Sequence, residues 1–148
     1  IKIEVSFKLY TPIIIYNLLL LITFSVSVNS YLNIQNINIL FYIIFHLTFI
    51  YFLFYHYHFS HFFLAFFYGV LFDILLLNTI GIHLVCFLIL ISTYILFKRY
   101  LFLLSSFQMS MTIYITLITT MYCEVILAFL INNIYFTKLL PSKISYNI

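Results

Sequence analysis

Long apolar runs, interrupted by a few short polar segments, dominate this chain. Residues 9–72 contain no Asp, Glu, Lys or Arg, and residues 74–97 and 100–123 are two further uncharged runs. A helix needs about 20 mainly apolar residues to cross the hydrocarbon core of a bilayer. The first run therefore has room for three spans, and each of the other two for one. The pattern predicts an all-α, polytopic integral membrane bundle of about five transmembrane helices.

Polar clusters divide these runs into spans at approximately residues 12–28, 39–55, 62–77, 80–97 and 109–136, within a single transmembrane domain over residues 1–148. Thr11 and Pro12 are typical of a helix start, with a hydroxyl cap before a proline at the first helical position. Residues 78–81 form a corner so short that its two helices must pack side by side. The first apolar stretch is too long for a signal-peptide core, so we expect it to be retained.

Composition and charge support the same class of protein. Hydrophobic residues make up 66% of the chain and charged residues 6%, whereas a soluble domain has about a quarter of its residues charged. A net charge of +3 without a basic stripe does not suggest nucleic-acid binding. The excess of Lys and Arg in short loops favours an N-terminus on the cytoplasmic side. The charged residues are Lys2, Glu4, Lys8, Asp73, Lys98, Arg99, Glu124, Lys138 and Lys143.

Asp73 is the residue least expected in such a sequence. A carboxylate near the middle of an otherwise uncharged span costs roughly 2.5–3.5 kcal/mol on insertion scales unless it is paired or protonated. Gly69 lies four residues earlier on the same helix face, where it would allow another backbone to approach. The next helix offers unsatisfied N–H groups near Gly81, Ile82 and His83, and the His83 ring could add a proton. Asp73 is either a structural clamp at this corner or a contact for a partner protein.

Glu124 is the second acidic residue within an apolar segment. No basic residue lies at its own depth in the predicted bundle. It is therefore protonated, shares a proton with Asp73, or awaits a basic residue of a partner.

The sequence pattern gives less indication of a function for the histidines and cysteines. His56, His58 and His61, with His46 upstream, have the residue type of a metal site. No carboxylate or thiolate accompanies them, and we expect histidines at the membrane interface instead. Both cysteines lie in apolar segments, where we expect them to pack as small apolar side chains rather than form a disulfide. The sequence predicts no metal site, no cofactor and no catalytic residue.

Both glycines of the chain flank Asp73, in an ordered pattern. Residues 63–73 are aromatic-rich and end in Gly-x-x-x-Asp, residues 78–83 form a short polar corner with the second glycine and a histidine, and the next helix ends in two basic residues. This pattern resembles the signature of the rod shape-determining protein MreD family. The resemblance covers about residues 38–136, and Glu124 falls where family members often keep an acidic residue. Members usually have a proline where this chain has Asn38, and a sixth span.

The resemblance implies a non-catalytic integral membrane scaffold subunit of the cell-wall elongation complex, involved in the regulation of cell shape. It implies a multi-pass location in the bacterial inner membrane. The implied partners are an MreC-like single-span protein, MreB and the synthases that build peptidoglycan, and not nucleic acid. Gly69, Asp73, Gly81, His83 and Glu124 would serve structure or partner contact.

A small membrane transport subunit is the alternative function. It would bind a solute between its helices, in a pocket lined by Asp73, His83 and Glu124. Since no nucleophile or metal set accompanies the two carboxylates, we predict no enzymatic activity.

Overall fold

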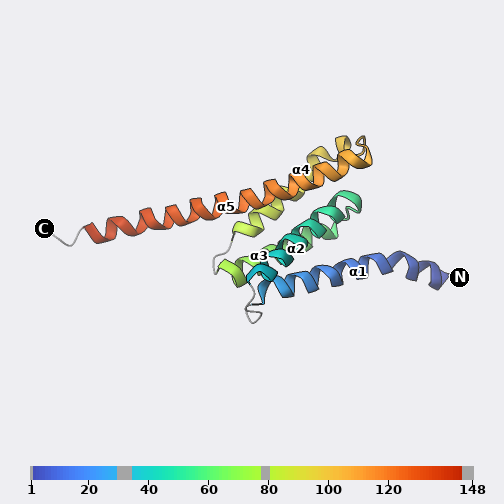
Figure 1. Ribbon diagram of the computed structural model, residues 1–148, viewed down its shortest axis with the longest axis horizontal. Coiled ribbons are helices and arrows are strands. Elements are labelled where there is room, and N and C mark those ends of the chain that lie inside the picture. Colours follow the sequence, from blue (N-terminus) through green and yellow to red (C-terminus); the bar gives the residue numbers. More distant parts are fainter. Residues whose placement is uncertain (1, 30–34, 78–80, 145–148) are drawn as a thin grey trace. The chain divides into compact units, whose positions relative to one another are not determined.

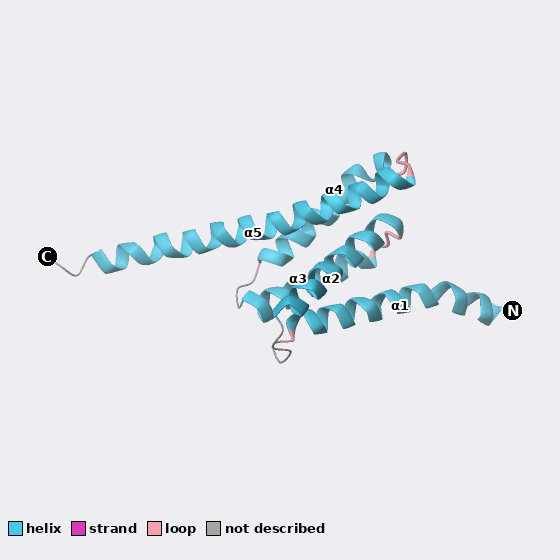
Figure 2. Ribbon diagram, viewed as in Figure 1, coloured by secondary structure: helices cyan, strands magenta, loops and turns pink. Residues whose placement is uncertain are grey.

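The computed structural model describes the backbone of residues 2–29, 35–77 and 81–144, and the side chains of residues 12–29, 37–76 and 81–133. Within these residues all regular structure is helical (Figures 1 and 2). The α-helices are α1 (Lys2–Val28), α2 (Gln35–Tyr55), α3 (Ser60–Phe72), α4 (Ile82–Leu101) and α5 (Ser106–Ile144). One π-helical turn, η1 (Asp73–Leu77), follows α3 directly.

Three described helical segments are long and apolar enough to cross a membrane. They are Ile37–Tyr55, Ile82–Leu101 and Ser106–Asn133, and the apolar segments Pro12–Val28 and Ser60–Leu76 are shorter. Large apolar side chains lie on the outside of the described helices. Such a continuous apolar surface suits lipid rather than water. The chain is therefore an all-helical membrane protein, which confirms the predicted fold class.

The chain packs as two compact units divided after Tyr57, and the first unit is a hairpin of α1 and α2. Within it, Tyr16 stacks on Phe52 with ring centroids 3.8 Å apart. Phe24 packs against Phe45 with ring centroids 6.2 Å apart. Aromatic contacts between the two helices thus hold this hairpin together. That both units belong to one transmembrane domain stays a prediction.

The second unit contains α3, η1, α4 and α5, and α4 contacts both α3 and α5. At the end of α3, the Phe72 ring lies 5.5 Å from the His83 ring and 6.4 Å from the Phe87 ring, measured between centroids. The buried residues Ile113, Leu117, Thr120 and Glu124 of α5 recur at the three- and four-residue spacing of one helix face. In Figure 1, α5 runs along α4 and extends well beyond it.

Several helix ends differ from those predicted. Because α1 begins at Lys2, Pro12 lies inside the helix and Thr11 is not its N-cap. Helix α4 continues to Leu101, which places Lys98 and Arg99 in its last turn. Cations are favoured there because they face the unpaired carbonyl groups of the helix end. Helix α5 exceeds the predicted 109–136 at both ends, so polar residues at the edge of an apolar run do not by themselves end a helix.

Candidate functional site

Asp73 lies where α3 meets the connection to α4. Helix α3 ends at Phe72, and the backbone N–H of Asp73 donates to the carbonyl groups of Gly69 and Val70. The chain then continues through η1 to Leu77. Such single π-helical turns are rare and occur frequently at functional sites. The prediction of an acid near mid-span is wrong, because the carboxylate sits close to the end of its helical segment.

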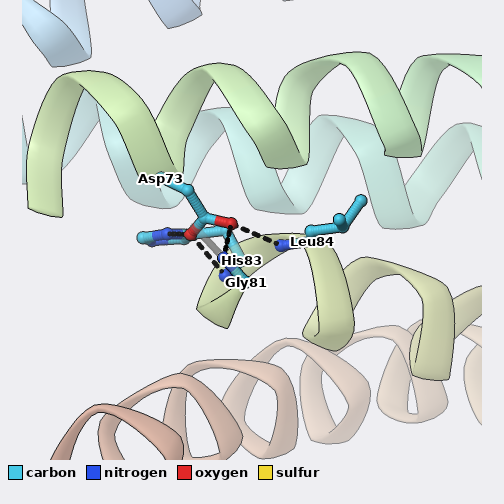
Figure 3. Close-up of polar contacts among 4 residues, drawn as sticks. All are labelled: Asp73, Gly81, His83 and Leu84. Carbon is cyan, nitrogen blue, oxygen red and sulfur yellow. Dashed lines mark hydrogen bonds and ion pairs between the residues drawn. The ribbon is translucent and has the colours of Figure 1, made fainter. Parts of the chain in front are cut away.

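The carboxylate of Asp73 is completely buried and accepts four hydrogen bonds from the start of α4 (Figure 3). Oδ1 lies 2.8 Å from the backbone nitrogen of His83 and 2.9 Å from Nδ1 of its ring. Oδ2 lies 2.8 Å from the backbone nitrogen of Gly81 and 3.2 Å from that of Leu84. The ring donates to the carboxylate when its proton is on Nδ1. We call Asp73, Gly81, His83 and Leu84 the corner clamp.

The corner clamp contains the predicted hydrogen bonds from the start of α4 to Asp73 and differs from the prediction in one donor. Gly81 and His83 donate as expected, but the hydrogen bonds of Asp73 include Leu84 and not Ile82. Residues 78–80 of the predicted polar corner lie outside the described residues. The role of the same residues as a contact for a partner protein stays a prediction.

The start of α4 supplies these donors because the first N–H groups of an α-helix have no partner within the helix. Gly81 is the N-cap residue, and its φ of 131° is one that residues with a side chain rarely adopt. Its carbonyl group accepts the N–H of Val85 at 2.9 Å and so begins the helix. The positive end of the helix dipole favours an anion at this point. Gly81 therefore lets the backbone enter α4 while its own N–H reaches Asp73.

Gly69 allows α3 and α4 to approach closely beside the acid. A Cβ atom added to Gly69 would lie 2.7 Å from the Cα of Leu84 and 3.1 Å from its backbone nitrogen. Non-bonded carbon atoms normally stay about 3.5–4.0 Å apart. The predicted backbone approach at this glycine is thus confirmed, and it occurs at the residue that completes the corner clamp.

The four hydrogen bonds are sufficient to offset the burial of the charge. Hydrogen bonds to a charged group contribute about 1.5–3 kcal/mol each. Removing an ion from water costs several kcal/mol after the protein relaxes. Because the two quantities are of similar size, these hydrogen bonds can hold Asp73 inside the bundle.

Glu124 is buried on α5 and takes no part in the corner clamp. The predicted alternatives for Glu124, including a proton shared with Asp73, stay predictions. The thiol of its neighbour Cys123 lies beside that of Cys86 on α4, and both cysteines are free. This contact places the Glu124 region of α5 opposite the turn of α4 that follows His83.

The remaining histidines have contacts within their own segments. The backbone nitrogen of His58 lies 3.1 Å from Nδ1 of His61, and Nδ1 of His46 lies 3.0 Å from the carbonyl oxygen of Tyr42. Among the residues that the structure describes, no group of three or more His, Cys, Asp or Glu side chains is placed to hold a metal ion.

The corner clamp is suited to fixing two helices relative to each other. Three of its four donors are backbone N–H groups, which do not exchange roles between donor and acceptor. Both oxygens of Asp73 are occupied by these bonds. The arrangement therefore immobilises an acidic side chain and joins the end of α3 to the start of α4.

Two contacts of this region could not be read from the sequence. Leu84 is an ordinary apolar residue, and only its backbone takes part. The pairing of Cys86 with Cys123 depends on the register between α4 and α5, for which the sequence carries no local signal. By contrast, the pattern of glycine, acid, glycine and histidine did indicate the rest of the corner clamp.

Comparison with known proteins gives no relative from which a function could be transferred. No family model matches the chain, and neither the curated proteins nor the solved structures give a match.

Proposed function

We propose that this protein is an MreD-like, non-catalytic scaffold subunit of the cell-wall elongation complex in the bacterial inner membrane. In this role it contributes to the control of cell shape by holding single-span and peripheral members of the complex in place. An MreC-like single-span protein, MreB and the peptidoglycan synthases are the proposed partners.

The corner clamp is the observation that supports this proposal. The residues on which the resemblance to the MreD family rests, namely Gly69, Asp73, Gly81 and His83, are in one packed cluster at the α3–α4 junction. A motif whose members are used to fix a helical corner is expected in a scaffold. The same hydrogen bonds occupy the carboxylate that a transport or acid–base function would need to leave accessible.

Apolar packing offers a mode of partner binding for such a scaffold. On α3, Phe63 and Phe67 are more than half exposed, as are Tyr122 and Val125 on α5. Association between helices in lipid depends on close packing and a few polar contacts, because lipid tails are as apolar as the side chains. A helix that is itself held rigidly presents such a surface without a large loss of conformational entropy.

Depletion of the protein in its own cells tests the proposal. We expect rod-shaped cells to widen and round up, and the insertion of a fluorescent cell-wall precursor along the side wall to become irregular. A plasmid copy of the unaltered gene and one carrying Ser92→Ala, an exposed position on α4, should both restore cell width. A copy with Asp73→Ala should restore it poorly and should accumulate to a lower level.

Normal width and normal wall labelling after depletion would contradict the scaffold function. If shape stayed normal while the uptake of a solute fell, the transport alternative would be favoured instead. Co-purification of a single-span membrane protein with the unaltered chain, and its loss with Asp73→Ala at matched protein levels, would identify the partner.

A further inference from the structure

The end of the second unit at which α4 meets α5 is unusually apolar on its outside (Figure 1). We call residues 95–107 the α4–α5 tip. The five most exposed of the large apolar side chains that the structure describes all belong to it. They are Leu103 at 83%, Phe102 at 74%, Leu96 at 73%, Phe107 at 71% and Tyr100 at 68%. Side chains of this kind are unfavourable in water, so the medium around the tip decides its role.

The backbone of the turn itself is satisfied within the chain. Each N–H group from Phe102 to Ser105 donates to an acceptor of the tip or of the following turn of α5. The acceptors are the carbonyl groups of Lys98, Tyr100 and Leu101 and the side-chain oxygen of Gln108, at 3.0–3.4 Å. A segment in contact with lipid has no water to satisfy its backbone and must do so internally. The turn meets this requirement at these four positions.

The tip projects beyond α3, which packs against the other half of α4. Gly69 of α3 lies against Leu84 of α4, and the two helices run in opposite directions. The first residue of α3, Ser60, is nine residues before Gly69, so it lies at the level of Thr93. Helix α4 continues from there to Leu101, which is about 12 Å at 1.5 Å per residue. Helix α3 therefore does not accompany the last two turns of α4.

The exposed side chains of the tip surround the helix rather than line one face. Ile95, Leu96 and Phe97 are consecutive and are all more than half exposed. Successive helical residues point about 100° apart, so these three cover an arc of about 200°. Earlier in α4 the exposed residues Val85 and Ile89 are four apart and share one face. A single partner helix covers one face, whereas an arc this wide requires a medium that surrounds the tip.

The length of α4 sets the depth of the tip in a membrane. Ile82–Leu101 is a membrane-crossing segment of 20 residues, or about 30 Å of helix, which equals the thickness of the hydrocarbon core. The turn after Leu101 thus falls at the edge of this layer, where aromatic rings are favoured. The long side chains of Lys98 and Arg99 fit the same depth, because such side chains can extend to the surface while their stems stay in apolar surroundings.

We propose that the α4–α5 tip is seated in the bilayer and does not project into water. Phe102, Leu103 and Phe107 insert among the lipid acyl chains just below the headgroups, with the turn at the interface. The partner is the acyl-chain layer, whatever the headgroup, because the seat is made by apolar side chains. It fixes the depth of the α4–α5 pair in the membrane and keeps this turn out of reach of soluble proteins. The proposal does not depend on the scaffold function.

A single tryptophan placed in the tip tests the proposal, because the chain contains none. Full-length Leu103→Trp is reconstituted in phosphatidylcholine vesicles, and its helical content is checked by circular dichroism. We expect emission shifted to the blue of free N-acetyltryptophanamide, little quenching by aqueous acrylamide, and loss of most emission when the lipid is brominated near the headgroup end of its acyl chains. Phe107→Trp is a second reporter and should give the same result.

Ile89→Trp is the matched control, because Ile89 is an exposed position within the span of α4. It should be quenched more by lipid brominated near the end of the acyl chain than the tip reporters are. Two results would overturn the proposal. Red emission with strong acrylamide quenching at both tip positions would place the tip in water. Blue emission that neither acrylamide nor brominated lipid quenches would show that protein, such as a second copy of this chain, covers the tip.

Discussion

Replacement of Gly69 by alanine tests the close approach of α3 and α4. The new methyl group would lie 2.7 Å from Leu84 Cα, so the two helices must separate locally by about 1 Å to reach an ordinary contact distance. Overpacking of this kind costs about 1–3 kcal/mol. The separation also lengthens the 3.2 Å bond from Leu84 to Asp73, which is the longest bond of the corner clamp.

The direction of the change in stability is informative, because replacing a glycine within a helix by alanine normally stabilises the protein. Gly to Ala in an unobstructed helix stabilises a protein by roughly 0.5–1 kcal/mol. We expect Gly69→Ala to lower the free energy of unfolding by about 1–2 kcal/mol after this gain is subtracted. Titration of the detergent-solubilised protein with dodecyl sulfate, followed by far-ultraviolet circular dichroism, measures the change.

The methyl group added by Gly69→Ala would overlap with backbone atoms of Leu84 rather than with its side chain. A second substitution at Leu84 can test this difference. Shortening the side chain with Leu84→Ala should not relieve the effect, so the double variant should be at least as unstable as Gly69→Ala alone. Stabilisation by Gly69→Ala, or full rescue by Leu84→Ala, would refute the close backbone contact.

Three other substitutions or treatments address neighbouring features. Asp73→Asn replaces an acceptor oxygen of the corner clamp with a donor group, so one or two charge-assisted hydrogen bonds are lost. This loss should lower the free energy of unfolding by about 2–4 kcal/mol in the same titration. An effect below about 0.5 kcal/mol, which is the range of exposed substitutions, would contradict the corner clamp. Gly81→Ala adds a methyl group that meets nothing within 4 Å. The positive φ at this position should nevertheless destabilise the variant by about 1–2 kcal/mol. An unchanged midpoint of the dodecyl sulfate titration would show that this backbone strain is absent. Mild oxidation with copper phenanthroline should join Cys86 to Cys123, so that neither thiol reacts with maleimide after unfolding. In the Cys123→Ser variant, Cys86 should still react. Two reactive thiols in the oxidised, unaltered chain would argue against the contact between these cysteines.

The helices were predictable because hydrophobic runs of span length leave few other structures possible in a membrane. The ends of the helices were less predictable. Thr11 and Pro12 carry the local signal of a helix start, but a proline also fits inside a helix at the cost of one hydrogen bond. The basic pair at the end of α4 marks the edge of the apolar run, and the helix passes through it because cations stabilise a C-terminal turn.

The corner clamp was predictable in outline for a different reason. A buried acid requires donors, and the nearest unpaired donors in the sequence belong to the start of the following helix. Which N–H groups point at the carboxylate depends on how α4 docks against α3, so Leu84 could not be distinguished from Ile82 in advance. The position of Glu124 relative to α4 depends on contacts between residues distant in sequence, for which hydrophobic spacing gives a face but not a register.

The corner clamp has a consequence for how this protein enters the membrane during synthesis. All the donors that satisfy Asp73 lie within 11 residues of it along the chain, so closing this loop costs little chain entropy. Asp73 therefore has its hydrogen-bond donors before α5 is synthesised and without another protein, so it can move from the translocation channel into the membrane at that stage. Segments α3 and α4 can thus partition into lipid as a helical hairpin whose buried acidic side chain already has its hydrogen-bond donors.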